Sequence, residues 1–227
     1  MPPAEQPVTI PAPGAVLDGD LVVPGGARAI VLFAHGSGSG RRSPRNRAVA
    51  RTLQGAGLAT LLMDLLTRSE EAADSSTGRL RFDIPLLAAR LGAATDWARS
   101  RAETRRLRIG YFGASTGAAA ALAAAAERPD AVGAVVSRGG RPDLTGPALA
   151  RVRAPTLLVV GGRDHAVIAM NQAARRDLTA DTELVIVPGA THLFEEPGAL
   201  EEVARLARDW FVRHLVEPGV TGSSAPG

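Results

Sequence analysis

The chain has 227 residues, no cysteine and a formal net charge of +3. This length suits one domain with a sizeable core, and an apolar fraction of 45% excludes a chain that is disordered throughout. The lack of cysteine excludes disulfides, a thiolate nucleophile and a cysteine-bound zinc. All 26 basic residues are arginine, which excludes lysine Schiff-base and P-loop chemistry. With only 4% aromatic residues, we expect no nucleic acid as a partner.

Strand and helix signals alternate along most of the chain. A short edge strand is expected at 8–10, and the apolar segments around Asp18-Gly19 predict a hairpin turn at that dipeptide. From residue 28 onward, apolar runs typical of strands covered on both faces alternate with helical segments. The strands are expected at 29–34, 58–63, 107–112, 131–136, 156–160 and 182–187. The helices are expected at 43–54, 83–101, 116–127, 147–152, 167–178 and 200–216. A surface loop is expected at 67–81, with a short helix around Glu70-Glu71 as an alternative.

This alternation predicts a single α/β domain over residues 1–216. We expect a mostly parallel sheet of about eight strands with helices on both faces. The segment 217–227 is rich in Gly, Ser and Pro and is expected to be a flexible tail. The uncharged stretch 109–126 contains glycines and hydroxyl side chains, which favour a strand, turn and helix over a membrane span. Because the first residues lack the basic and apolar regions of a signal peptide, we expect a cytoplasmic protein.

The segment Gly113-Ala114-Ser115-Thr116-Gly117 lies between a predicted strand and an alanine-rich helix. It is the G-x-S-x-G pattern in the strand–turn–helix context of a nucleophile elbow. The serine of such an elbow occupies a strained turn, and the flanking glycines let strand and helix approach closely. The helix N-terminus places backbone N–H groups beside the oxygen that becomes anionic. We therefore predict Ser115 as a nucleophile.

A serine nucleophile needs a base and an acid that orients the base. His192 follows the last predicted strand, in a loop that can reach back to the serine. Asp164 follows another buried strand and is the expected acid, although it could instead cap the next helix. The order Ser115, Asp164, His192 is one of the three chain orders in which such triads occur. His165 and His214 are expected at the surface.

An oxyanion hole needs a second backbone donor besides the N–H of Thr116, which follows the nucleophile. The segment 33–40 is rich in small residues and follows the first parallel strand. Ser37 is the expected donor, with Gly38 as the second choice. The alternative is a glycine-rich connection that serves tight packing only. His35, in the same segment, is expected to make structural hydrogen bonds.

The chain resembles the α/β-hydrolases, and among them the small dienelactone hydrolase-like proteins. The resemblance covers Val8 to Val216 and rests on four motifs: His35-Gly36-Ser37-Gly38, Gly113–Gly117, Gly161–Asp164 and Thr191-His192. It implies an α/β-hydrolase fold that cleaves esters or lactones with a nucleophile–acid–His triad and no cofactor or metal. The namesake enzymes have cysteine at the elbow, so Ser115 favours a serine esterase mechanism.

Two features bear on the substrate. The connection after residue 136 has an ordinary crossover length, so we expect no lid domain and a small, soluble ester or lactone as substrate. Arg138, Arg141 and Arg41 follow predicted strands at the edge where the nucleophile lies and are candidates for binding an anionic group. Pairing with nearby aspartates is the alternative role of these arginines. Membrane contact is not expected, and the chain is expected to be a monomer or homodimer.

Two rival functions come from other classes. A dinucleotide-binding protein is suggested by Gly36, Gly38 and Gly40 after a strand, with Asp64 ending the next one. However, Arg41 stands where the third glycine of that motif would be needed for close packing. The other rival is a hydrolase fold that serves as a binding module without turnover. The complete triad argues against this second rival.

Overall fold

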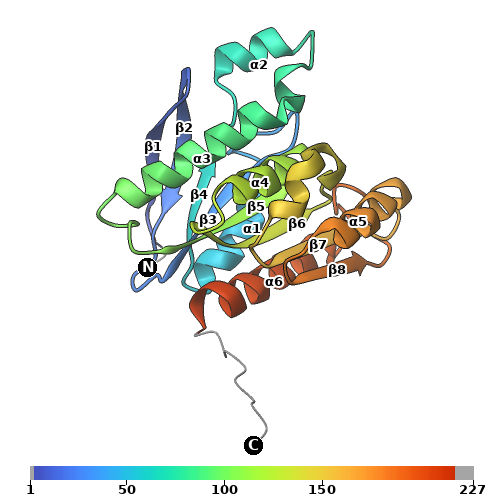
Figure 1. The fold of residues 1–227 in the computed structure, drawn as a ribbon. Helices are drawn as coiled ribbons and strands as arrows, with labels where there is room; N and C mark the ends of the chain where they lie inside the picture. Colours follow the sequence, from blue (N-terminus) through green and yellow to red (C-terminus); the bar gives the residue numbers. More distant parts are fainter. Residues whose placement is uncertain (1–2, 218–227) are drawn as a thin grey trace, which may run out of the picture.

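The computed structural model describes residues 3–217, so the predicted tail lies outside it apart from Glu217. An eight-stranded sheet forms its centre, in the order β1-β2-β4-β3-β5-β6-β7-β8 (Figure 1). Strands β3 to β8 are parallel, whereas β1 pairs antiparallel with β2, and β2 with β4. The strands are β1 (Glu5–Ala12), β2 (Ala15–Val22), β3 (Ala29–Ala34), β4 (Ala59–Met63), β5 (Arg108–Ala114), β6 (Val132–Arg138), β7 (Thr156–Gly161) and β8 (Thr182–Val187).

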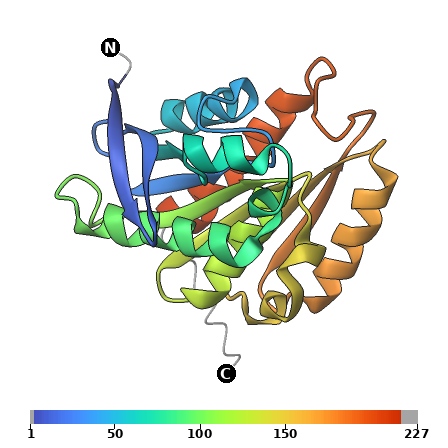
Figure 2. The same cartoon turned by 90° about the horizontal axis from the view of Figure 1, so that it is seen from above.

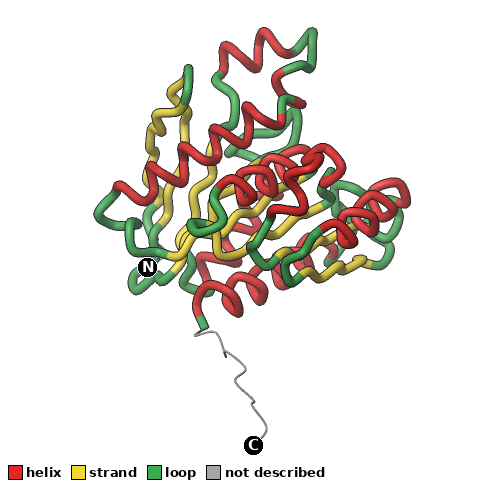
Figure 3. The backbone as a smooth tube through the Cα atoms, viewed as in Figure 1, coloured by secondary structure: helices red, strands yellow, loops and turns green. Residues whose placement is uncertain are grey.

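Helices cover both faces of the sheet, as the alternating pattern predicted. Helices α1 and α6 lie on one face, and α3, α4 and α5 lie on the other (Figure 2). The strands therefore run between two helical layers, while α2 stands apart from both (Figure 3). The helices are α1 (Pro44–Gly55), α2 (Arg68–Asp74), α3 (Ile84–Ser100), α4 (Thr116–Glu127), α5 (His165–Asp177) and α6 (Ala199–Phe211), with short segments η1 (Leu80–Phe82), η2 (Pro142–Arg151) and η3 (Val212–Val216).

The core is split into two apolar layers by the sheet. Every residue of β3, β4 and β7 is buried, which explains why these strands read as continuous apolar runs. In α4, residues 116–126 are all buried, and most of them are alanine. Small side chains let this helix pack close to the sheet. The turn between β5 and α4 is therefore fixed by both elements.

The N-terminal hairpin differs from the prediction. Its turn lies at Pro13-Gly14, where Gly14 has φ = +70°, and not at Asp18-Gly19. Gly19 is instead inside β2, where an added Cβ would lie 3.1 Å from Val8 and 3.2 Å from Leu61. The glycine is needed for this packing between strands, a long-range requirement that a dipeptide turn signal does not contain.

Two further expectations need correction. The helix predicted at 147–152 is part of the 3₁₀ segment η2, which begins earlier and is interrupted at Gly146 with φ = +60°. His214 is half-buried rather than solvated, because its ring packs on Trp210 with centroids 4.2 Å apart. His165 is exposed at the start of α5, as predicted. In residues 3–217, no helix has the length and apolar character needed to cross a membrane.

The parallel strands bring the candidate residues to one edge of the sheet. Ser115 follows β5, Asp164 lies beyond β7 and His192 lies beyond β8. Ser37 follows β3, the neighbour of β5 on the other side. The carboxyl edge of a parallel sheet is where ligands of such folds bind, so the topology supports a site at this edge.

Candidate active site

The turn at Ser115 has the strained backbone of a nucleophile elbow. Ser115 has φ = +51° and ψ = −119°, a conformation that side-chain-bearing residues rarely adopt. A Cβ at Gly117 would overlap the backbone oxygens of Ala34 and His35, and a Cβ at Gly113 would overlap the backbone of Ala118. Both glycines are therefore required for the close approach of β3, β5 and α4.

We expect Gly117→Ala to destabilise the protein by about 3 kcal/mol or more, because the new methyl group would meet rigid backbone rather than a movable side chain. Urea unfolding followed by circular dichroism measures the change in the free energy of unfolding. The matched control is Gly25→Ala, since a Cβ at Gly25 meets nothing within 4 Å. An equally small effect of both substitutions would contradict the steric explanation of the elbow.

The structure joins the predicted base and acid. His192 Nδ1 lies 2.6 Å from Asp164 Oδ2, a hydrogen-bond distance. The Asp164 side chain is 15% exposed and that of His192 is 40% exposed, so the imidazole remains open to a substrate. Asp164 makes no capping bond to α5, so the alternative role as a helix cap is not used.

The segment 138–139 connects His192 to the nucleophile. The Ser115 N–H donates to the Arg138 carbonyl at 3.1 Å, which fixes the elbow to the end of β6. The next residue, Gly139, has φ = +52°, and a Cβ there would lie 3.4 Å from the His192 ring. Ser115 and His192 thus lie next to neighbouring residues, Ser115 beside Arg138 and His192 beside Gly139. Phe194, two residues after His192, is buried with φ = +56° and completes this strained loop.

The predicted oxyanion residues lie side by side. An added Cβ at Gly36 would lie 3.2 Å from Ser115 Cβ, so the loop after β3 approaches the nucleophile closely. The Ser37 N–H donates to the hydroxyl of Thr116 at 3.0 Å. The N–H of Thr116 is the first of α4, and the first four N–H groups of a helix have no partner within the helix. The Ser37 N–H thus already donates to the Thr116 hydroxyl. To donate to a substrate oxygen, it would have to share this hydrogen bond or exchange it.

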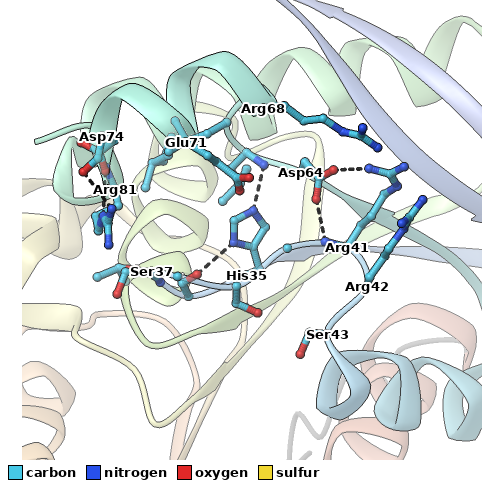
Figure 4. Close-up of a pocket in the computed structure, with 18 of the residues that line it drawn as sticks. His35, Ser37, Arg41, Arg42, Ser43, Asp64, Arg68, Glu71, Asp74 and Arg81 are labelled. Carbon is cyan, nitrogen blue, oxygen red and sulfur yellow. Dashed lines mark hydrogen bonds and ion pairs between the residues drawn. The ribbon is translucent and has the colours of Figure 1, made fainter. Parts of the chain in front are cut away.

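His35 has the structural role expected from its sequence position. Its Nδ1 lies 2.9 Å from the Gly36 carbonyl, and Nε2 accepts a hydrogen bond from the Leu65 N–H at 2.9 Å (Figure 4). The acceptor role of Nε2 requires the neutral ring with its proton on Nδ1. Burial lowers the pKa of His35 from its ordinary value of 6.5. The ring therefore connects the loops after β3 and β4 as a neutral group.

This lowered pKa predicts that stability falls as the solution becomes acidic. The unfolded chain protonates His35 near pH 6.5, whereas the folded state resists protonation to a lower pH. Between the two values the unfolded state binds more protons, so the free energy of unfolding decreases with falling pH by at most about 1.4 kcal/mol per pH unit. The contribution is complete above pH 6.5.

Urea unfolding at several pH values between about 5 and 8 tests this dependence. His35→Asn should remove this part of the slope, and His165→Asn should retain it because His165 is exposed. Identical slopes for wild type and His35→Asn would refute the assignment.

Three arginines proposed for an anionic group have different partners. Arg41 forms ion pairs with Asp64, Asp18 and Asp20. Arg141 pairs with Asp143 at 2.7 Å. Arg138 is 7% exposed, and its Nε and Nη1 have no partner within residues 3–217. Aspartate pairing, the alternative role, therefore applies to two of the three side chains.

Asp64 also bears on the dinucleotide-binding rival. Its carboxylate accepts a hydrogen bond from the Arg41 N–H at 2.7 Å and an ion pair from the same guanidinium (Figure 4). A Cβ at Gly40 would lie 2.8 Å from Asp64 Oδ1, so the two segments are packed together. Asp64 is engaged by its own chain and is not presented to a ribose.

A cavity of about 880 Å³ extends from the oxyanion residues toward α2. Its lining includes Ser37 and Thr116 together with Arg68, Glu71 and Arg81 from the segment 67–81. Figure 4 shows Arg81 on the same side of the view as Ser37, with Arg68 on the other side. Sequence reasoning missed the contribution of the segment 67–81 to this cavity, although its charged composition was an available signal. The segment, expected as a surface loop, contains the helix α2 and the start of the short segment η1. Within residues 3–217, no three His, Asp or Glu side chains are grouped in a way that could bind a metal ion.

Residues 17–215 match the dienelactone hydrolase family. The chain belongs to this family. The match confirms the resemblance that the four motifs suggested. A dienelactone hydrolase from Anabaena variabilis is 60% identical, with a TM-score of 0.93 over 95% of this chain and 100% of that one. The fold is that of an α/β-hydrolase, as predicted.

Two further relatives set the limits of the comparison. A Mycobacterium tuberculosis protein, named provisionally as a phosphoribosyl transferase, is 55% identical over 204 residues, which are 90% of this chain and 45% of that protein. The chain thus spans about half the length of this relative. An α/β serine hydrolase without lid from Xanthomonas campestris is 18% identical, with a TM-score of 0.72 over 96% of this chain and 99% of that one, and shows the fold alone.

Proposed function

We propose that this chain is a serine hydrolase that cleaves small carboxylic esters or lactones through an acyl-enzyme on Ser115. The observation that carries the proposal is the hydrogen bond of 2.6 Å between His192 and Asp164, beside the strained turn that presents Ser115. Family membership supplies the hydrolase class, and the serine in place of cysteine favours an esterase.

In the proposed reaction, His192 Nε2 accepts the proton of Ser115 Oγ as the oxygen attacks the carbonyl carbon. Asp164, bonded to Nδ1, keeps the proton on that nitrogen and stabilises the imidazolium that forms. The imidazolium then protonates the departing alkoxide, and the acyl group stays on Ser115. A water molecule, deprotonated by His192, releases the acid in the second half of the reaction.

Negative charge develops on the carbonyl oxygen during both halves. The N–H of Thr116 and, once released from the Thr116 hydroxyl, the N–H of Ser37 are the proposed donors to this oxygen. The positive end of the α4 dipole lies at the same place. Fixed donors stabilise the tetrahedral intermediate without reorganising, which is why the elbow has to be rigid.

Small soluble substrates fit the cavity of about 880 Å³ that opens beside these donors. No cofactor takes part in the proposed reaction. The cytoplasmic location and the monomeric or dimeric state remain predictions. The transferase name of the M. tuberculosis relative belongs to a protein about twice as long, and the proposed triad supports hydrolysis by this chain.

A fluorophosphonate probe tests the proposal directly, because it reacts preferentially with an activated serine. We expect covalent labelling of wild type at Ser115, detected by mass spectrometry of the peptide, together with hydrolysis of p-nitrophenyl butyrate. A binding module without turnover would give neither signal. Folded protein that resists the probe and hydrolyses no ester would refute the proposed function.

A further inference from the structure

A buried asparagine on α5 lies where an apolar side chain is expected. The buried residues of this helix are Val167, Asn171 and Ala174, at the i, i+4 and i+7 spacing of a core-facing stripe. Asn171 is 0% exposed at the centre of this stripe, and its Oδ1 has no partner within residues 3–217. Burying an amide is unfavourable unless hydrogen bonds compensate, so the bonds of its nitrogen have to account for its presence.

The amide nitrogen of Asn171 donates two hydrogen bonds. One goes to the Val167 carbonyl of the same helix at 2.8 Å, and the other goes to the Gly140 carbonyl at 3.0 Å. Both partners are carbonyl oxygens, which only accept, so the amide has to present its nitrogen to them. The second bond joins α5 to residues 138–141, which follow β6 and are called the 138–141 turn below.

The 138–141 turn is bonded to Ser115 at both of its ends. The Arg138 carbonyl accepts the Ser115 N–H at 3.1 Å, and the Arg141 N–H donates to the Ser115 carbonyl at 3.2 Å. The Gly140 carbonyl and the Arg141 N–H belong to one planar peptide group. Asn171 therefore holds the oxygen of the same peptide whose N–H holds Ser115.

The same turn also contacts His192. A Cβ at Gly139 would lie 3.3 Å from the His192 carbonyl oxygen and 3.4 Å from Cε1 of its ring. A Cβ at Gly140 would overlap Ser137 Oγ and lie 2.8 Å from Ala118 Cβ, so the turn is closely packed there. A displacement of this turn would therefore change the surroundings of both Ser115 and His192.

We propose that Asn171 is a positioning residue of the active site. Its amide fixes the peptide between Gly140 and Arg141, and through the 138–141 turn it sets the distance between Ser115 and the His192 ring. The proposal rests on the proposed function, because this distance matters to the reaction only if His192 removes the proton of Ser115. Asn171 does not line the cavity, so it acts on the rate and not on substrate binding.

Asn171→Leu removes the hydrogen bonds and keeps a side chain of similar size. A misplacement of about 1 Å between reacting groups can slow a reaction about a hundredfold. We therefore expect kcat for p-nitrophenyl butyrate to fall about ten- to a hundredfold, with KM changed less than about twofold. Labelling of Ser115 by the fluorophosphonate probe should slow with it. Asn171→Ala adds no bulk and should show the same loss of kcat if the leucine variant fails to fold.

Val167→Ala is the matched control, because it loosens the same buried stripe of α5 and leaves the bond from Asn171 to Gly140 in place. It should lower the melting temperature while kcat changes less than about twofold. Equal losses of kcat in Val167→Ala and Asn171→Leu would show a general effect of α5 packing and overturn the proposal. A folded Asn171→Leu enzyme with the kcat of wild type would also overturn it.

Amide hydrogen exchange followed by NMR tests the turn without a substrate. In Asn171→Leu the N–H groups of Ser115 and Arg141 should exchange at least about tenfold faster than in wild type, whereas that of Leu32 in β3 should be unchanged. Unchanged exchange at the turn, in a wild type that is an active esterase, would refute the role of Asn171 and retain the proposed function. Faster exchange in the variant of a wild type that hydrolyses no ester would refute the proposed function and retain Asn171 as the residue that fixes the turn.

Discussion

Ser115→Ala should lower kcat for p-nitrophenyl butyrate by about 10⁴- to 10⁶-fold, with KM little changed. The substitution removes the attacking oxygen, while the proposed N–H donors remain: Thr116 at the start of α4 and Ser37 in the loop after β3. What activity is left should come from these donors and from substrate binding alone. Initial rates at high enzyme concentration, with circular dichroism as the control for folding, measure the loss.

The double substitution provides the stricter test. Ser115→Ala and His192→Ala should each cost about as much as both together, because the base has no function without the nucleophile. Additive losses would mean that the two side chains act in separate steps. In that case the contact of His192 with Asp164 would be structural, and the proposed mechanism would be wrong.

Much of this site could be predicted because its signals are local or topological. The elbow depends on glycines at fixed spacing around Ser115, and the structure shows the backbone that each glycine approaches. The meeting of Asp164 and His192 follows from a simpler rule. Both come after parallel strands, and the carboxyl ends of such strands share one edge of the sheet.

The errors concern contacts between distant segments. Asp18-Gly19 has the composition of a turn, yet Gly19 is retained for its packing against Val8 and Leu61. His214 was expected in solvent, and only the folded chain shows it against Trp210. Tertiary packing overrides a local signal in both cases.

The partners of the arginines also depend on contacts between distant segments. The chain has 26 basic and 23 acidic side chains, so sequence proximity cannot show which pairs form. Arg41 and Arg141 pair with aspartates, whereas Arg138 lies at a buried strand end where no carboxylate of residues 3–217 pairs with it. Which of these arginines are paired with a carboxylate therefore appears only in the folded protein.

Asp164→Asn should reduce kcat by about 10⁴-fold while the fold is retained. An asparagine in this position can donate its amide N–H to Nδ1, which favours the tautomer with the proton on Nε2. In that tautomer Nε2 cannot accept the proton of Ser115, so His192 no longer acts as a base. The base is lost even though the asparagine amide replaces the carboxylate in the hydrogen bond of 2.6 Å. The single-turnover rate with p-nitrophenyl butyrate measures the chemical step.

Asp64→Asn is the matched control, because Asp64 also follows a strand at this edge but is bound to Arg41 rather than to a histidine. Its loss should affect stability, through the contacts of the Arg41 loop, and change kcat less than about tenfold. A folded Asp64→Asn enzyme that is slower than Asp164→Asn would show that the wrong carboxylate had been assigned. The two residues are thus separated by their partners: only a carboxylate that contacts the imidazole can set its tautomer.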